Sequence, residues 1–98
     1  MGFYNLTEEA KGDLNRIWLR GFTEWNEAQA DRYYHAFFDR FELIAEQPFS
    51  YPPADYIREG FRKNVCGVDT IYYRVAGEGV EIVAIIGRQD VGKILKKP

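Results

Sequence analysis

The sequence predicts an α+β fold in which a helical hairpin packs on one face of an antiparallel β-sheet. Residues 60–90 contain three short apolar runs rich in Val, Ile and Tyr, and turn residues separate them, as in a β-meander. Residues 7–46 instead repeat apolar side chains at the three- and four-residue spacing of helices. The expected order of elements is β-α-α-β-β-β, followed by a short tail helix.

The first helix is expected to follow a short extended run at residues 3–6, which we interpret as an edge strand. Thr7 is a good N-cap, because Glu8 and Glu9 come next and anions are favoured in the first turn of a helix. The helix should end near Glu24. Its apolar stripe is Ala10, Leu14, Ile17, Trp18 and Phe22.

The second helix should begin after Asn26, because Asn26 followed by Gln29 resembles a capping box. It should run to about Glu46, and so short a connection makes the two helices an antiparallel hairpin. Gly21 weakens the first helix, or else it allows close packing against the second. The stripe of the second helix is Ala30, Tyr33, Tyr34, Phe37, Phe41 and Ile44, with Phe38 beside it.

The three strands are predicted at Phe61–Cys66, Thr70–Val75 and Val80–Ile86, after a proline-rich loop at residues 47–57. Gly77 and Gly79 supply the tight connection between the last two strands. A short tail helix is expected within residues 88–95, where Asp90 could cap it. The shared core should contain Leu14, Ile17, Phe37, Phe41, Ile71, Tyr73, Val75, Ile82 and Ala84.

Length and composition favour one domain over residues 1–98, with 46% hydrophobic residues and just enough core to fold alone. The single cysteine, Cys66, excludes an internal disulfide and is typical of a reducing cytoplasm. No apolar run is long enough to span a membrane, and the N-terminus does not resemble a signal peptide. We therefore expect a cytoplasmic protein.

Charged residues are unevenly distributed along the chain. Residues 1–59 hold 6 basic and 11 acidic side chains, whereas residues 60–98 hold 7 and 4. The basic second half favours an acidic partner, although ordinary surface scatter explains the difference equally well. Aromatic residues make up 16% of the chain, which is more than one small core hides easily, so some should face a partner.

The usual catalytic and metal-binding patterns are missing from the sequence. It has no glycine-rich phosphate loop, and one His with one Cys cannot form a zinc site, so we expect no cofactor and no metal. His35 lies in the middle of a predicted helix and is interpreted as a structural or surface residue. Cys66 ends a strand and is interpreted as core packing.

Basic residues on the strands are the best functional candidates, because guanidinium groups recognise phosphates and carboxylates. They are Arg62, Lys63, Arg74 and Arg88. Alternation places Tyr73 toward the core and puts Tyr72 and Arg74 together on the opposite face. We expect that face to bind a target, the alternative being an ordinary solvated outer face.

Several segments together resemble the ParE toxins of the RelE/ParE superfamily of toxin–antitoxin systems. They are Tyr4–Ala10, Glu27–Tyr34, Ile71–Val75, Gly79–Val83 and Gly87–Asp90. The resemblance covers nearly the whole chain, and it depends on the order and spacing of these segments. Many relatives carry His where this chain has Ile86, and Gly92 interrupts the expected tail helix. The net charge of −2 also differs from the basic character of many such toxins.

The resemblance implies a toxin that inhibits DNA gyrase and is neutralised by a ParD-like antitoxin. By that resemblance, a C-terminal segment of the antitoxin would fold onto aromatic and basic residues of this chain. The expected antitoxin-binding residues are Trp18, Phe22, Trp25, Tyr33, Tyr34, Phe38, Arg62, Arg74 and Arg88. The expected target-binding residues are Lys63, Tyr72, Arg74 and Arg88, with no catalytic residue.

Two alternatives remain open at this point. RelE-type relatives cleave mRNA on the ribosome, but the basic sheet face here has no His or other evident acid–base residue nearby, which favours an inhibitor over a nuclease. The chain could also be an antitoxin-binding module that has lost toxicity. We expect neither membrane association nor direct sequence-specific binding to nucleic acid.

Overall fold

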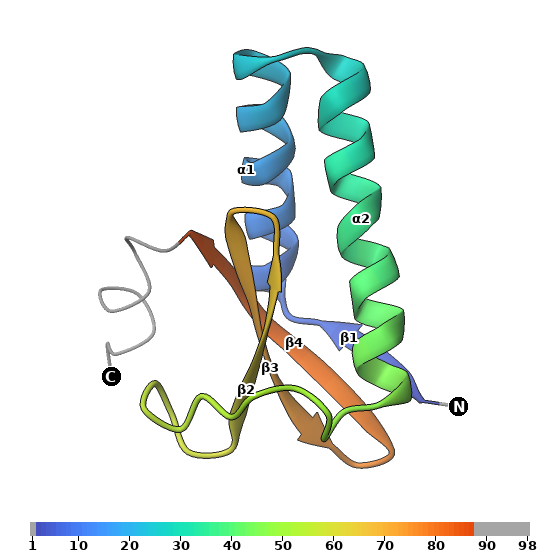
Figure 1. Cartoon of the computed structure of the whole chain (residues 1–98), viewed down its shortest axis with the longest axis vertical. Helices are drawn as coiled ribbons and strands as arrows, with labels where there is room; N and C mark the ends of the chain where they lie inside the picture. The colour runs from blue at the N-terminus through green and yellow to red at the C-terminus, as the bar shows by residue number, and fades with distance from the viewer. Residues whose placement is uncertain (1, 88–98) are drawn as a thin grey trace.

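Two helices and a four-stranded sheet form the protein in the computed structural model, which describes residues 2–87 (Figure 1). The predicted order of elements is confirmed. The predicted tail helix within residues 88–95, which includes Arg88, lies outside the described residues. The single-domain organisation of residues 1–98 stays a prediction. The elements are β1 (Phe3–Leu6), α1 (Glu8–Glu24), α2 (Glu27–Glu46), β2 (Phe61–Cys66), β3 (Asp69–Ala76) and β4 (Gly79–Gly87).

The sheet has the strand order β1-β4-β3-β2. Strands β2, β3 and β4 form the predicted antiparallel meander, and β1 joins it as the predicted edge strand. Because β1 pairs with β4 in parallel, the sheet is mixed rather than purely antiparallel. The first strand of the chain therefore lies beside the last described one.

Both helices begin at the residues that the sequence indicated. The side chain of Thr7 accepts a hydrogen bond from the backbone N–H of Ala10, and that of Asn26 accepts one from Gln29. Gly21 is a packing site: a Cβ at this position would lie 3.2 Å from the Cα of Ala30, which is tighter than ordinary contact. The absence of a side chain here lets α1 and α2 approach closely (Figure 1).

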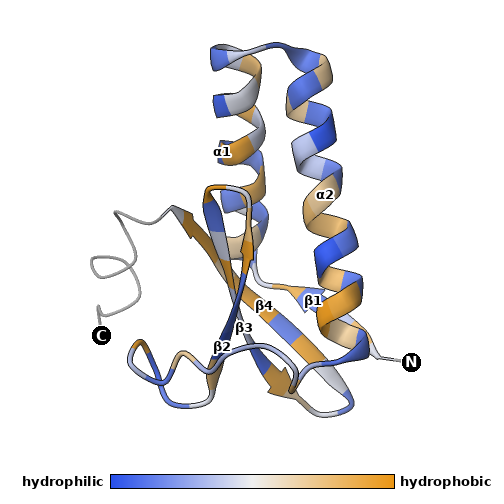
Figure 2. Ribbon diagram, viewed as in Figure 1, coloured by the Kyte–Doolittle hydropathy of each residue, from blue (hydrophilic) through white to orange (hydrophobic). Residues whose placement is uncertain are grey.

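The main core lies between the helical hairpin and one face of the sheet. Hydrophobic residues recur among hydrophilic ones along both helices (Figure 2). The buried residues repeat at intervals of three or four positions, which gives each helix an apolar stripe. Tyr4 and Tyr33 pack against this core at its margins. Its buried residues include Leu14, Ile17, Phe37, Phe41, Ile44, Ile71, Tyr73, Val80, Ile82 and Ile85.

A β-bulge in β4 changes which residues face this core. Tyr73 pairs with Ile82, but Tyr72 pairs with Ala84, so Val83 is an extra residue on the β4 side. The extra residue shifts the in-and-out alternation by one, and Ala84 faces away from the helices. The prediction that Ala84 belongs to the main core is therefore wrong, and Val75 is only half-buried at its edge.

The face of the sheet away from the helices carries a second, smaller core. It buries Ala54, Phe61, Tyr72, Ala84 and Ile86. Ala54 belongs to the segment between α2 and β2, which folds back over this face. The sheet is therefore covered on both sides, by the helical hairpin and by this segment.

The segment of residues 47–60, here named the back loop, is fastened to the sheet by several hydrogen bonds. The backbone N–H of Ala54 donates to the carbonyl of Phe61 (2.7 Å), and that of Lys63 donates to the carbonyl of Pro52 (3.0 Å). The Tyr73 hydroxyl donates to the carbonyl of Pro48 (2.7 Å). The first two bonds pair the outer edge of β2 at Phe61–Lys63, which would otherwise be an open template for another strand.

We expect Phe41→Ala to lower the free energy of unfolding by about 3–5 kcal/mol, because this ring is fully buried and its removal leaves a cavity. Leu43→Ala, on the same helix at a position that is 49% exposed, is the matched control and should cost about 1 kcal/mol or less. Urea unfolding followed by circular dichroism measures both. Equal losses for the two variants would contradict the placement of Phe41 in the core.

Candidate partner-binding site

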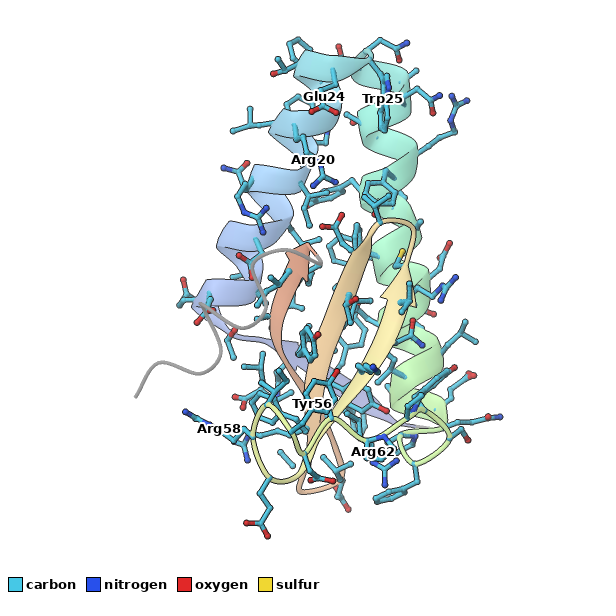
Figure 3. All side chains as sticks on the ribbon, turned by 60° about the vertical axis from the view of Figure 1, so that its left-hand side comes forward. Arg20, Glu24, Trp25, Tyr56, Arg58 and Arg62 are labelled. Atoms are coloured by element: carbon cyan, nitrogen blue, oxygen red, sulfur yellow. The ribbon has the colours of Figure 1, made fainter. Side chains whose placement is uncertain are left out.

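Two aromatic side chains near the hairpin tip, Phe22 and Trp25, are exposed, and Trp18 of α1 is half-buried. Trp18 and Phe22 stack on one another with ring centroids 5.2 Å apart, and the Trp18 indole N–H donates to Asp31 at 2.8 Å. Trp25, which caps the C-terminus of α1, is 61% exposed (Figure 3). Exposed large aromatic residues on a rigid helical frame are typical of a protein-binding surface.

The aromatic residues of α2 divide between two sides of that helix. Tyr34 and Phe38 are half-buried, with ring centroids 5.2 Å apart, and Tyr34 lines a shallow hollow with Trp18, Asp31 and His35. Tyr33 lies on the other side, toward the turn between β2 and β3. The predicted antitoxin-binding aromatics therefore form two surfaces rather than one, with Trp25 and Tyr33 on the second.

A polar network that the sequence did not predict joins three elements behind Tyr33. Asp69, at the start of β3, is fully buried, and its Oδ2 accepts from Arg20 of α1 at 2.8 Å. The Tyr33 hydroxyl of α2 lies 2.9 Å from the same oxygen, 2.7 Å from the carbonyl of Cys66 and 3.2 Å from the N–H of Val68. Burial, and then the bond to Asp69, raises the pKa of Tyr33 well above its usual range.

The basic strand residues are largely engaged within the protein. Arg62 donates to the carbonyl of Tyr51 (2.8 Å) and lies over the ring of Phe49, so it holds the back loop (Figure 3). Lys63 donates to the hydroxyl of Tyr56 at 3.1 Å. Arg74 is exposed and pairs with Glu81 across the strands at 2.7 Å. Of the predicted cations in the described part of the chain, Arg74 is the most accessible one.

Tyr72 corrects the predicted target-binding face. The side chain is 4% exposed. It packs in one cluster with Phe61 and Ala84 of the sheet and with Ala54 of the back loop, which covers this face. Its burial raises its pKa to about 12. The prediction that Tyr72 shares an exposed face with Arg74 is wrong, because alternation alone cannot show that a distant loop covers one end of that face.

The two residues expected to be structural are placed accordingly. Cys66 is buried in the main core, and burial raises the pKa of its thiol, which disfavours a reactive thiolate. His35 is exposed on α2, with its ring 5.9 Å from that of Tyr34. Whether either residue affects activity stays a prediction.

Residues 2–87 contain no group of three or more side chains that could hold a metal ion. Within the same range, no helix is long and apolar enough to cross a membrane.

The sequence analysis missed residues that matter in this region. Arg20, Asp69 and Val68 were not singled out, because the bonds that join them to one another or to Tyr33 span 35 to 49 positions of sequence. Arg32 was also missed, although it lines a hollow together with Trp25 and Tyr33. The available sequence signal for Asp69 was its position, because an acidic residue there directly precedes the apolar residues of a strand.

The fold is shared with a solved structure described as the chromosomal ParDE toxin–antitoxin system from P. aeruginosa. The match has a TM-score of 0.78 and 16% sequence identity, and it covers 89% of this chain and 96% of that one. This likeness defines the class of fold, a helical hairpin on a ParE-like sheet.

The family is defined by sequence. A family model described as the ParE toxin of the type II toxin–antitoxin system parDE matches residues 4–92. Toxin ParE1 of Caulobacter vibrioides is 35% identical over 83 residues, covering 85% of either chain. Toxin ParE1 of Mycobacterium tuberculosis is 33% identical over 94 residues, covering 94% of this chain and 96% of that one. The chain therefore belongs to the ParE toxins of type II toxin–antitoxin systems.

We expect Asp69→Asn to lower the free energy of unfolding by about 1.5–3 kcal/mol, because it removes a charge-assisted bond to Arg20. Arg20 remains 31% exposed and can turn to water, so the cost should stay below that of a fully buried broken pair. Asp39→Asn, at an exposed position of α2, is the control. Thermal melts of the three proteins test this, and indistinguishable melting of all three would contradict a stabilising role for the network.

The buried tyrosines should make the protein sensitive to alkaline pH. Burial raises the pKa of Tyr72 and of Tyr73 from about 10 to about 12. Between these values the folded state binds more protons than the unfolded chain, so the free energy of unfolding should fall as pH rises. Urea midpoints measured across this range test it, and Tyr73→Phe should show a shallower decline. A flat profile in the parent protein would contradict the expectation.

Proposed function

We propose that this ParE toxin inhibits DNA gyrase and is neutralised by a ParD-like antitoxin that binds the aromatic surfaces of its helical hairpin. Membership of the ParE family supports the pairing with an antitoxin. The exposed aromatic residues at the hairpin tip support binding there, since Trp and Tyr are enriched among residues that dominate binding energy. In this proposal the toxin acts by protein contact and catalyses no reaction.

The observation that carries the proposal of an inhibitor is the covered back of the sheet. A ribonuclease needs an open surface where acid and base groups reach a scissile phosphate. In the described chain the back loop buries Tyr72 on this face, and Arg62 and Lys63 are engaged in holding that loop. Arg74 keeps an exposed guanidinium, but its cross-strand partner is Glu81. These contacts favour a binding role for the exposed remainder of the face.

Arg74 is the target-contact candidate that remains accessible at the sheet. Its guanidinium is half exposed beside a hollow lined also by Arg58 and Glu59 of the back loop. Arg74 and Arg88 are the two cations that we propose to contact gyrase, and Arg88 lies outside the described residues. Lys63 contributes less in this proposal because its amine contacts Tyr56.

Expression of the toxin with and without its cognate antitoxin tests the proposed function. We expect filamentation and DNA damage in cells without the antitoxin, and stabilised gyrase–DNA cleavage complexes with purified toxin and gyrase. Rapid mRNA cleavage without any effect on gyrase would favour the ribonuclease. Full growth with folded toxin would instead indicate a non-toxic antitoxin-binding module.

Variants of His35 and Cys66 sharpen that experiment. His35→Ala and Cys66→Ser should keep the toxicity of the parent, because neither side chain lies on an open sheet face. Arg74→Glu should reduce toxicity by reversing the exposed charge. Toxicity lost in a folded His35→Ala protein but kept in Arg74→Glu would contradict the proposed mode of action.

A further inference from the structure

A groove of about 440 Å³ runs between α2 and the turn that joins β2 to β3. Its size lies within the roughly 300–1,000 Å³ of typical ligand pockets, which suits a few consecutive side chains of a peptide. Trp25, near the tip of the hairpin (Figure 3), is one of the residues that line the groove. The groove is lined mainly by apolar surface, from Trp25, Tyr33, Ala36, Gly67 and Val68, with Arg32 as its charged residue.

The turn that forms one wall of this groove is held rigidly against Tyr33. Gly67 has φ +63°, and a Cβ at that position would lie 2.6 Å from the Tyr33 ring, so only glycine fits. The Tyr33 hydroxyl accepts from the N–H of Val68 at 3.2 Å, and the neighbouring oxygens of Cys66 and Asp69 are within reach of its proton. A groove fixed in this way loses little conformational freedom when a ligand binds.

The exposed groups of the groove define the chemistry of its ligand. Trp25 and Val68 are 61% and 68% exposed, so an apolar ligand would remove a substantial hydrophobic area from water. Arg32 is exposed and forms no ion pair with any residue in the range 2–87. A guanidinium in that position favours a carboxylate on the ligand. The matching ligand is an apolar segment with an acidic residue beside it.

We propose that this groove binds an apolar-and-acidic segment of the cognate antitoxin, with apolar side chains between Trp25 and Val68 and a carboxylate on Arg32. The proposal rests on neutralisation by an antitoxin, as given above, and adds the site and the chemistry of the bound segment. A second copy of the toxin fits less well, because a twofold contact here would bring two Arg32 side chains into one interface. The groove is distinct from the hollow between α1 and α2 lined by Trp18 and Tyr34.

Titration of full-length toxin with full-length cognate antitoxin at low and high ionic strength tests the proposal. Trp25→Ala should weaken binding by about 30-fold or more, the level of a hot-spot residue. Arg32→Glu should weaken it by about 10-fold at low salt and by less at high salt, because screening reduces both attraction and repulsion of exposed charges. Both positions are exposed, so neither change should disturb folding.

Matched controls separate the groove from general effects of surface substitution. Leu19→Ala replaces an apolar side chain of α1 that is 51% exposed, and Arg58→Glu reverses an exposed charge on the back loop. Both control variants should bind the antitoxin like the parent. Circular dichroism and thermal melts establish that all four variants are folded.

The possible results separate this inference from the proposed function. If the parent toxin does not bind its antitoxin, neutralisation by that partner is wrong and the groove assignment fails with it. If the parent binds but both groove variants bind equally well, the antitoxin lies elsewhere and only the groove assignment is overturned. If sedimentation shows that the groove variants lose self-association while antitoxin binding is unchanged, a second copy is the occupant and the assignment is likewise overturned.

Discussion

The hydroxyl of Thr7 makes the junction on which the rest of the structure depends. It accepts the N-cap bond from Ala10 and donates to the carbonyl of Val83 at 2.8 Å, at the bulge of β4. The bulge turns Ile85 toward the helices and Ala84 toward the back loop, so β4 supplies residues to both cores. Beyond the end of β1, side chains of α1 provide hydrogen-bond partners for the backbone of β4. Asp13 accepts from the N–H of Ile85, and Arg16 donates to the carbonyl of Ile85.

Because both faces of the small sheet are covered, charged residues of its strands form contacts with the covering segments. The back loop lacks helical or strand structure, and it depends on side chains such as Arg62 for its position. A basic strand residue employed in this way contributes to stability. The helical hairpin instead exposes aromatic side chains such as Phe22 and Trp25, which the space between helices and sheet does not bury.

Local signals explain which features could be predicted from sequence. The caps at Thr7 and Asn26 depend on residues three positions apart, and strand β2 was predicted with its observed bounds because Gly60 and Gly67 flank it. The burial of Tyr72, the bulge at Val83 and the buried Asp69 depend on contacts between distant segments. Alternation predicts which side chains share a face, but it does not predict whether a loop covers that face or an extra residue interrupts the strand.

The parallel pairing of β1 with β4 has a consequence for synthesis of the protein. Strand β1 is made first, yet its partner is the last described strand and occupies an interior position in the sheet. The bond from Thr7 to Val83 spans 76 positions of sequence. A nascent chain that stops before residue 79 has the helical hairpin but lacks the strand that joins β1 to β3. The ordered toxin surface therefore forms only when translation of the domain is nearly complete.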